Sequence, residues 1–271
     1  MTEPKKYALP VALATLLALV APIAPAADKL LEGINEYREA LADGNPSELV
    51  AAEGEELWKT ARGPKNASLE KCDLGLGPGV VKGVSAQLPR FFKDTGKVQD
   101  LETRLMSCME TLQGIDPQAV VKAGWLKGEK EKMAALVAYI VTESNGHKVK
   151  VDLANPAMQK MYELGKLAFY YRAGPMDFSC ATCHGDTGKR IRMQELPDLR
   201  THEGAIAGWG SWPAYRVSNG QFWTMQHRLN DCYRQQRLAE PIYGSDVTIA
   251  LSVYLAGKAN GGKVVTPGIK R

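Results

Sequence analysis

The C-terminal half of the chain alternates apolar helical stretches with polar and glycine-rich segments. Residues 156–174 carry apolar side chains at helical spacing and end at Gly174 and Pro175, as helices commonly do. The polar stretch 220–237 predicts a second helix, and the apolar run 246–257 predicts a third that packs against the others. This pattern indicates a mainly α-helical fold with long loops.

The region before it repeats the same pattern weakly but in the same order. One match aligns Arg104 with Arg228 and Cys108 with Cys232. Three matches in register favour an internal duplication over chance similarity. The matching stretches are 131–146 with 246–261, 103–113 with 227–237, and 55–63 with the helical stretch before residue 175.

The stretch FSCATCHGDTG contains Cys180, Cys183 and His184 in the C-x-x-C-H pattern of c-type haem attachment. Two thiols at this spacing can bond to the two vinyl groups of one haem, and the adjacent imidazole then reaches the iron as the proximal ligand. A zinc site would need a second Cys/His pair at suitable spacing, and a thioredoxin-like motif would open a long helix. The motif therefore predicts one covalently bound haem c.

The stretch EKCDLGLGPG lies where the first copy of the repeat should carry its haem motif. Aligning Cys72 with Cys180 puts Gly75 at the second cysteine and Leu76 at the histidine, so the first copy lacks a haem site. We therefore expect a mainly α protein with two tandem cytochrome c-like domains.

The expected boundaries place a signal peptide at 1–27, the domain without haem at 28–150 and the haem-binding domain at 151–271. The N-terminal segment begins with basic residues, continues with an apolar run and ends with small residues, with cleavage expected after Ala26 or Ala27. The alternative is a membrane anchor, but prolines interrupt the apolar run.

Composition excludes some functions and leaves others open. A net charge of +4 over 271 residues is too small to suggest nucleic-acid binding, although it allows a local positive pocket for a small anion. No other stretch is long and apolar enough to span a bilayer, so we expect no stable membrane anchor. Export to the periplasm follows, where exposed thiols oxidise.

The chain has five cysteines, and their number restricts their roles. Cys180 and Cys183 belong to the haem motif. Cys72 and Cys108 both lie in the first domain, where a disulfide between them would close the space that a haem would fill. The alternative, two free thiols, conflicts with an oxidising compartment. Cys232 is then left without a cysteine partner.

Five downstream side chains could occupy the sixth position of the haem iron. Cys232 differs from the others because it is an unpaired thiol in an exported protein, four residues after Arg228. On a helix both side chains would share one face, where a guanidinium favours the thiolate and binds tetrahedral oxyanions. The candidates are Met193, His202, Met225, His227 and Cys232.

Several motifs together resemble the SoxA family. They are YYRAG with FSCATCHG, SWPAYR and HRLNDCYRQQR, behind a degenerate cytochrome domain. This family comprises the catalytic c-type cytochrome subunits of the SoxAX complex of thiosulfate-oxidising bacteria. The resemblance covers essentially the whole mature chain. With CDLGL in the first domain, the chain is similar to the single-haem form, in which a disulfide replaces the first haem.

The resemblance implies a role for each motif residue. Cys180 and Cys183 would bind haem covalently, with His184 as its proximal axial ligand. Cys232 would be the distal axial ligand and would carry a catalytic persulfide. Arg228 would hold the sulfonate of thiosulfate.

The implied reaction is the oxidative conjugation of thiosulfate to a cysteine of the carrier complex SoxYZ, an L-cysteine S-thiosulfotransferase activity. Electrons would pass through haem to the partner cytochrome SoxX. Arg216 and Arg237 would add positive potential, and neither is assigned a catalytic role. The rival hypothesis is an electron-transfer cytochrome c without a substrate, with a Met or His distal ligand. A cytochrome c peroxidase needs two haem motifs, and this chain has one.

Overall fold

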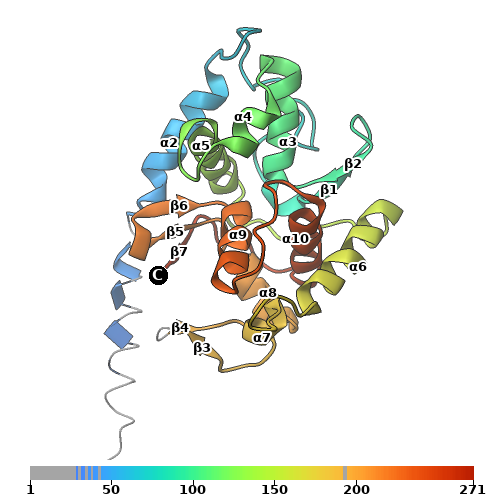
Figure 1. Ribbon diagram of the computed structural model, residues 1–271. Coiled ribbons are helices and arrows are strands. Elements are labelled where there is room, and N and C mark those ends of the chain that lie inside the picture. Colours follow the sequence, from blue (N-terminus) through green and yellow to red (C-terminus); the bar gives the residue numbers. More distant parts are fainter. Residues whose placement is uncertain (1–28, 30–31, 34–35, 38, 42–43, 192–193) are drawn as a thin grey trace, which may run out of the picture. The chain divides into compact units, whose positions relative to one another are not determined.

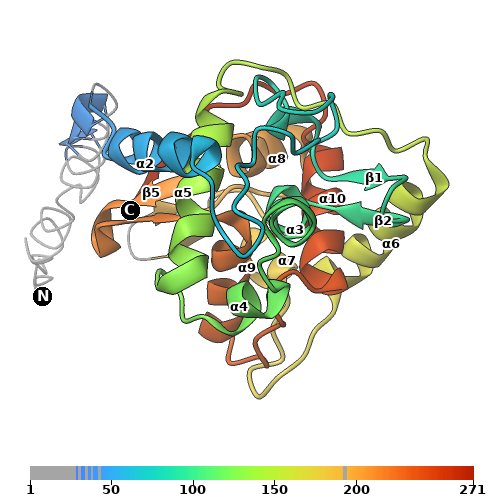
Figure 2. The same cartoon turned by 90° about the horizontal axis from the view of Figure 1, so that it is seen from above.

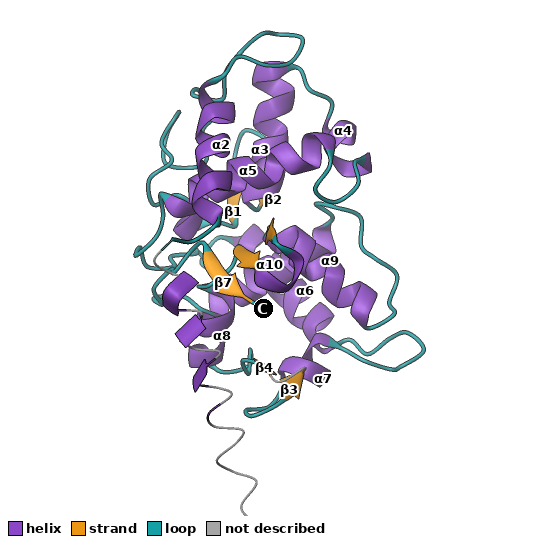
Figure 3. Ribbon diagram, turned by 90° about the vertical axis from the view of Figure 1, so that its left-hand side faces the viewer, coloured by secondary structure: helices purple, strands orange, loops and turns teal. Residues whose placement is uncertain are grey.

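Helices dominate this computed structural model, and its strands are short (Figures 1 and 3). The structure describes residues 29, 32–33, 36–37, 39–41, 44–191 and 194–271, so the expected signal peptide lies outside the described residues. Residues 44–271 form one compact unit. Its α-helices are α2 (Ser47–Lys59), α3 (Leu101–Cys108), α4 (Pro117–Lys122), α5 (Gly128–Thr142), α6 (Pro156–Tyr170), α7 (Cys180–His184), α8 (His202–Trp209), α9 (Met225–Gln235) and α10 (Asp246–Lys258). The other elements are the 3-10 helices η3 (Ser85–Gln87) and η5 (Val217–Asn219), the π-helix η4 (Met109–Gln113), and the strands β1 (Arg90–Phe92), β2 (Lys97–Gln99), β3 (Arg190–Ile191), β4 (Gln194–Glu195), β5 (Ala214–Arg216), β6 (Gln221–Trp223) and β7 (Gly268–Lys270).

The same helix crossing occurs twice, and each time a glycine permits it. Helix α2 packs on α5, and α6 packs on α10 (Figure 2). A Cβ atom on Gly54 of α2 would lie 1.9 Å from the carbonyl oxygen of Ala135, and one on Gly165 of α6 would lie 1.9 Å from that of Ala250. Any larger residue would force the two backbones apart.

A second matching set surrounds α3 and α9. The antiparallel hairpin β1–β2 precedes α3, and the hairpin β5–β6 precedes α9 with the same lengths and spacing. Both hairpin turns contain a glycine with positive φ, Gly96 at 66° and Gly220 at 63°. Asp100 and Thr224 begin the two helices, and each side chain accepts a hydrogen bond from the amide three residues on.

The turn after α2 matches the turn after α6 and corrects the expected alignment. Counting on from these turns places Cys72 opposite Cys183 and Asp73 opposite His184. The prediction that paired Cys72 with Cys180 is therefore wrong, because one shared cysteine cannot fix the register of two diverged loops. The matching turn residues are Arg62, Gly63, Asn66 and Ala67 in the first, and Ala173, Gly174, Asp177 and Phe178 in the second.

The two halves share one interior. Phe222 and Tyr243 lie in the same apolar cluster as residues of α3 and α5. The buried carboxylate of Glu102 on α3 accepts hydrogen bonds from the amide of Gln226 at 3.0 Å and from the hydroxyl of Tyr243. Strand β5 lies between β6 and β7 in a three-stranded sheet. Within the described residues, no helix is both long and apolar enough to cross a membrane.

The predicted helices occur, with shorter ends. Helix α10 agrees with the predicted 246–257. Helix α9 begins at Met225 rather than at 220, because the preceding residues pair in a hairpin, and it ends before Arg237, which has a φ of 56°. Helix α6 ends at Tyr170, before the turn at Gly174.

Candidate functional site

A single helical turn carries the C-x-x-C-H motif. Ser179 precedes α7, and its hydroxyl accepts a hydrogen bond from the amide of Thr182 at 3.3 Å, while the Thr182 hydroxyl accepts one from the amide of Ser179 at 2.9 Å. This reciprocal capping nucleates a very short helix in a loop. Cys180, Cys183 and His184 are thereby held on one turn.

The imidazole of His184 is oriented by the loop that follows. Its Nδ1 lies 3.0 Å from the carbonyl oxygen of Pro197. Burial lowers the pKa of His184, so the ring is neutral at neutral pH, with the proton on Nδ1 donated to that carbonyl. Nε2 then keeps its lone pair, as a metal-ligating histidine requires.

The thiols of Cys180, Cys183 and Cys232 are partly buried and interact electrostatically beside this motif. Burial raises the pKa of the Cys180 thiol to about 12, and negative charge on Cys232 or Cys183 adds to that rise. Apolar side chains packed with Cys180 line the space: Phe169, Leu199, Leu229, Leu251 and Leu255.

These residues fit a c-type haem. Two thiols stand at the attachment spacing, an imidazole keeps a free Nε2, and the lining is apolar. Among the described residues, no group of three or more His, Cys, Asp or Glu side chains is arranged to hold a bare metal ion. The donor set therefore suits a porphyrin rather than a metal ion alone.

Helix α9 carries Cys232 within electrostatic range of Cys180 and Cys183, with Arg228 one turn earlier on the same helix. The positive charges of Arg228 and Arg216 lower the pKa of the Cys232 thiol, but burial acts more strongly, and the net effect raises that pKa. Arg228 thus acts in the expected direction on the pKa of Cys232, and burial outweighs its effect. Desolvation destabilises the thiolate more than the guanidinium stabilises it.

Arg228 has neighbours that its position in the sequence did not reveal. Its Nη1 lies 3.3 Å from Oδ2 of Asp231, and its Cζ lies 5.6 Å from the ring centroid of Trp212. The spacing of Arg228 and Asp231 on a helix could have signalled the ion pair. Nothing local in the sequence connects Trp212 to Arg228, because the contact joins a loop to a later helix.

The other candidate ligands differ in their surroundings. Met193 lies outside the described residues. His202 is exposed, and its Nδ1 contacts the carbonyl oxygen of Lys258 at 2.8 Å. The ring of His227 is stacked between two tryptophans, with centroid distances of 4.2 and 4.0 Å. Met225 packs in the same apolar cluster as Cys180.

Arg216 and Arg237, to which no catalytic role was assigned, lie in different parts of the structure. Arg216 lies on β5, and its Cζ stands 5.2 Å from the ring centroid of Trp223. Its positive charge lowers the pKa of Cys232, the smallest of the effects on that thiol. Arg237 is exposed beyond the end of α9.

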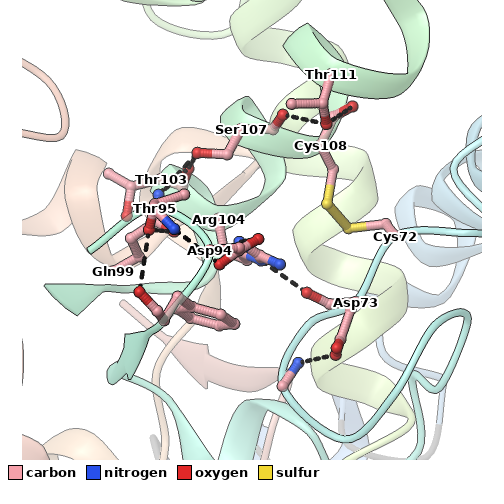
Figure 4. Close-up of polar contacts among 12 residues, drawn as sticks. Cys72, Asp73, Asp94, Thr95, Gln99, Thr103, Arg104, Ser107, Cys108 and Thr111 are labelled. Carbon is pink, nitrogen blue, oxygen red and sulfur yellow. Dashed lines mark hydrogen bonds and ion pairs between the residues drawn. A yellow bond between two sulfur atoms is a disulfide. The ribbon is translucent and has the colours of Figure 1, made fainter. Parts of the chain in front are cut away.

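In the first half, the residues that correspond to Cys232 and Arg228 are Cys108 and Arg104, and both already have partners. The expected disulfide joins Cys72 to Cys108, with an S–S distance of 2.01 Å and a Cα–Cα distance of 5.6 Å (Figure 4). Arg104, which corresponds to Arg228, is buried and donates to the carbonyl oxygen of Asp73 at 2.7 Å and to the carboxylate of Asp94 at 2.8 Å. This half therefore presents neither a free thiol nor a free guanidinium here.

Comparisons with known proteins agree with this description. The family model described as SoxA/TsdA, cytochrome c domain, matches residues 53–149. The chain is 70% identical over 241 residues to the L-cysteine S-thiosulfotransferase subunit SoxA of Hydrogenophilus thermoluteolus, covering 89% of this chain and 88% of the relative. It is 38% identical to a protein of the same name from Hydrogenobacter thermophilus, covering 83% and 82%.

A solved structure gives the same result. The crystal structure of SoxXA from P. pantotrophus superposes with a TM-score of 0.72 at 28% identity, covering 87% of this chain and 84% of that one. Sequence and fold therefore agree over most of both chains. The chain belongs to the SoxA family of cytochrome c-domain proteins.

Proposed function

We propose that this protein is the subunit that catalyses oxidative conjugation of thiosulfate to a cysteine of the SoxYZ carrier, an L-cysteine S-thiosulfotransferase reaction. One observation carries the proposal. Helix α9 places the free thiol of Cys232 within electrostatic range of the haem-motif cysteine Cys183 and of the guanidinium of Arg228. The curated relatives carry the name of this activity.

We assign one haem c to the second half. Cys180 and Cys183 would attach it covalently, and His184 would bind its iron through Nε2. Cys232 would be the distal axial ligand. When bound, the haem supplies an electron acceptor beside the sulfur chemistry. Its attachment would also explain why neither motif thiol takes part in the disulfide, which joins Cys72 to Cys108.

The residues of the site would act in two steps. Arg228 holds the sulfonate of thiosulfate through paired N–H donors and directs the sulfane sulfur at the terminal sulfur carried by Cys232. An S–S bond forms between these atoms as one proton leaves to solvent and two electrons pass to the oxidised cytochrome acceptor. The carrier thiolate then attacks the sulfane sulfur, the bond between the sulfane sulfur and the terminal sulfur carried by Cys232 breaks, and the anionic terminal sulfur is restored near Arg228.

The tandem organisation supports this assignment of one haem. We divide the chain into a domain without haem at 28–150 and a haem domain at 151–271, after a signal peptide at 1–27. The cytochrome family model matches residues 53–149, which contain no C-x-x-C-H motif. There the disulfide of Cys72 and Cys108 would hold together the loop and the helix that a bound haem would otherwise connect.

Partners and location follow from the family and the chemistry. SoxX would be the cytochrome partner, since the superposed structure is a SoxXA complex. SoxYZ and thiosulfate would be the substrates. The periplasm is the compartment that suits a disulfide, a c-type haem and the expected signal peptide.

Mass spectrometry of the mature protein tests the cysteine assignment. We expect one haem on Cys180 and Cys183, one disulfide between Cys72 and Cys108, and additional sulfur mass on Cys232. A disulfide that includes Cys232 would contradict the proposal, because the catalytic sulfur would then be blocked.

Kinetics test the reaction itself, with thiosulfate, SoxYZ and an oxidised cytochrome as the acceptor. Cys232→Ala should remove activity. Arg228→Gln should lower kcat/KM for thiosulfate by about 10- to 100-fold, the equivalent of one charge-assisted hydrogen bond. Arg237→Gln, which changes an exposed arginine of the same segment, is the matched control and should match the wild type. Activity retained in Cys232→Ala would contradict Cys232 as the catalytic sulfur, and no turnover by the wild type would favour an electron-transfer cytochrome without a substrate.

A further inference from the structure

Helix α9, which carries Arg228 and Cys232, begins against the first half of the chain. The amide of Gln226 in its first turn donates a hydrogen bond to Oε1 of Glu102 on α3, at 3.0 Å. The first amides of a helix have no partner within that helix. A carboxyl group that lies 124 residues earlier in the sequence therefore completes the start of α9.

The side chain of Gln226 extends this contact. Its Nε2 donates to Oδ2 of Asp100 at 2.6 Å, and its Oε1 accepts from the amide of Gly244 at 3.2 Å. Gln226, Glu102 and Asp100 are all buried. A buried amide that loses its acceptor cannot turn to water instead, so this contact should hold the first turn of α9 firmly in place.

A ring contact holds the next residue of the same turn. The imidazole of His227 stacks on Trp125, with 4.2 Å between the ring centroids and 6° between the ring planes. Trp125 lies between α4 and α5, in the first half. Two successive residues at the start of α9 are thus in contact with the half that lacks the haem motif.

The matching helix of the first half starts differently. In α3 the amide of Thr103 donates to Oδ1 of Asp100 at 2.8 Å, and the amide of Asp100 donates to the hydroxyl of Thr103 at 3.0 Å. Thr224 and His227 occupy these positions in α9, where the amide of His227 donates to the hydroxyl of Thr224 at 3.2 Å and the His227 ring stacks on tryptophan. Helix α3 is thus capped by its own residues, and α9 is capped in part by the other half.

Glu102 is itself held by the residues around it. The hydroxyl of Tyr243 donates to its Oε2, and burial together with the nearby charge of Asp100 raises the pKa of Glu102 to about 8. The carboxyl group is therefore mostly protonated at neutral pH, and its Oε1 still accepts from Gln226. Glutamine has the same shape, carries no charge and keeps this oxygen, whereas leucine fills a similar space without an acceptor.

We propose that the first half positions the helix that carries Arg228 and Cys232, through Glu102, which caps its first turn, and through Trp125, which stacks on the next residue. Arg228 follows Gln226 by two residues, and Cys232 lies one turn further along the same helix. The proposal rests on the proposed function for the roles of Arg228 and Cys232. It gives the half without a haem motif a part in the reaction that requires no cofactor.

Hydrogen exchange followed by mass spectrometry tests the contact in the haem-loaded protein. Glu102→Leu should speed exchange in a peptide that covers residues 224–229 by about 10-fold relative to the amides of α10, the equivalent of one lost hydrogen bond. Glu102→Gln should leave this ratio at its wild-type value, because glutamine keeps the acceptor. An unchanged ratio in Glu102→Leu would overturn the proposal, and so would an equal increase in Glu102→Gln.

The haem spectrum and the kinetics test the consequence for the site. In Glu102→Leu we expect a change in the absorption bands that report the axial ligands. We also expect kcat to fall by about 10- to 100-fold, with KM for SoxYZ within about twofold of the wild type. Glu102→Gln should keep the wild-type spectrum and kcat. A wild-type spectrum and kcat in Glu102→Leu would reduce Glu102 to a structural role and overturn the proposal.

The variant with both Cys72→Ala and Cys108→Ala is the control for general weakening of the first half. It removes a cross-link of the same half and leaves Glu102 in place, so its haem spectrum and kcat should match those of the wild type. Changes as large as those of Glu102→Leu would mean that any weakening of this half suffices, and they would contradict a specific positioning of α9.

Trp125→Leu keeps the proposal testable if Glu102→Leu does not fold. It removes the ring that stacks on His227, and we expect faster exchange at the start of α9 and a changed haem spectrum. Trp58→Leu is its matched control, because it removes a buried tryptophan that packs on Tyr139 within the first half. Equal effects of the two tryptophan substitutions, or no effect of Trp125→Leu, would overturn the positioning of α9 by the first half.

Exchange and the haem spectrum need no substrate, so they judge the positioning separately from the reaction. If the wild type does not turn over thiosulfate, the proposed function fails, while faster exchange and an altered spectrum in Glu102→Leu still support the positioning of α9. If the wild type turns over thiosulfate and Glu102→Leu matches it in exchange, spectrum and kcat, the positioning fails and the proposed function stands.

Discussion

Removing the disulfide of the first half should destabilise the protein by an amount that the chain geometry predicts. Cys72 and Cys108 are 36 residues apart and both buried. Opening a loop of this length increases the entropy of the unfolded chain, and loop-closure theory converts this to about 4 kcal/mol at 25 °C. Replacing both cysteines by alanine adds a smaller cost for lost sulfur packing.

The same reasoning predicts that the two substitutions are not additive. Either Cys72→Ala or Cys108→Ala already opens the loop, so each single variant should lose nearly as much stability as the double variant. Urea unfolding followed by circular dichroism is the assay. With a slope of about 3 kcal/mol per molar urea, the midpoint should fall by roughly 1–1.5 M.

Two results would refute this account. Additive losses in the single variants would mean that each sulfur contributes by packing and not by cross-linking. A midpoint equal to that of the wild type would mean that the cross-link adds nothing. Turnover of thiosulfate by the folded double variant should persist, because the catalytic cysteine lies in the other half.

Two further predictions concern the packing between helices and between halves. Burial and the nearby charge of Asp100 raise the pKa of Glu102 to about 8, so its contribution to stability is complete below the unfolded value of about 4.5 and is lost as pH rises through 8. The free energy of unfolding of Glu102→Gln, measured with urea, should therefore rise by several kcal/mol relative to that of the wild type between pH 5 and pH 8. Parallel pH profiles of the two proteins would show instead that Glu102 is charged in the folded protein over this range. Gly165→Ala should lower the free energy of unfolding by about 2 kcal/mol or more, because its Cβ would meet the carbonyl oxygen of Ala250 at 1.9 Å. Glu163→Ala, on the exposed side of the same helix, should keep a free energy of unfolding within about 0.5 kcal/mol of the wild type. Similar losses of stability in the two variants would exclude the close approach of α6 and α10 as the cause.

Features that depend on neighbours in the chain could be predicted from the sequence. The spacing of Cys180, Cys183 and His184 indicates its chemistry without any tertiary information, because all three lie on one turn. The position of Arg228 four residues before Cys232 likewise places both on one helix face. The number of cysteines then leaves one of Cys72, Cys108 and Cys232 unpaired, and in the structure it is Cys232, because Cys72 is bonded to Cys108.

The register of the repeat needed the structure. The segment between α2 and α3 (60–100) is shorter than the corresponding segment between α6 and α9 (171–224), so a sequence comparison aligned Cys72 with the wrong cysteine of the motif. The matching backbone turns at Gly63 and Gly174 corrected the alignment. Turn geometry is retained where side chains have diverged, because it depends on a few residues that tolerate positive φ.

Burial and through-space charge were also decided by tertiary structure alone. The sequence suggested that Arg228 would lower the pKa of Cys232, but segments distant in the chain bury the thiol and reverse the sign. Motifs of adjacent residues fix which chemistry is present. The energy of a charge depends on everything packed around it, and only the folded chain sets that environment.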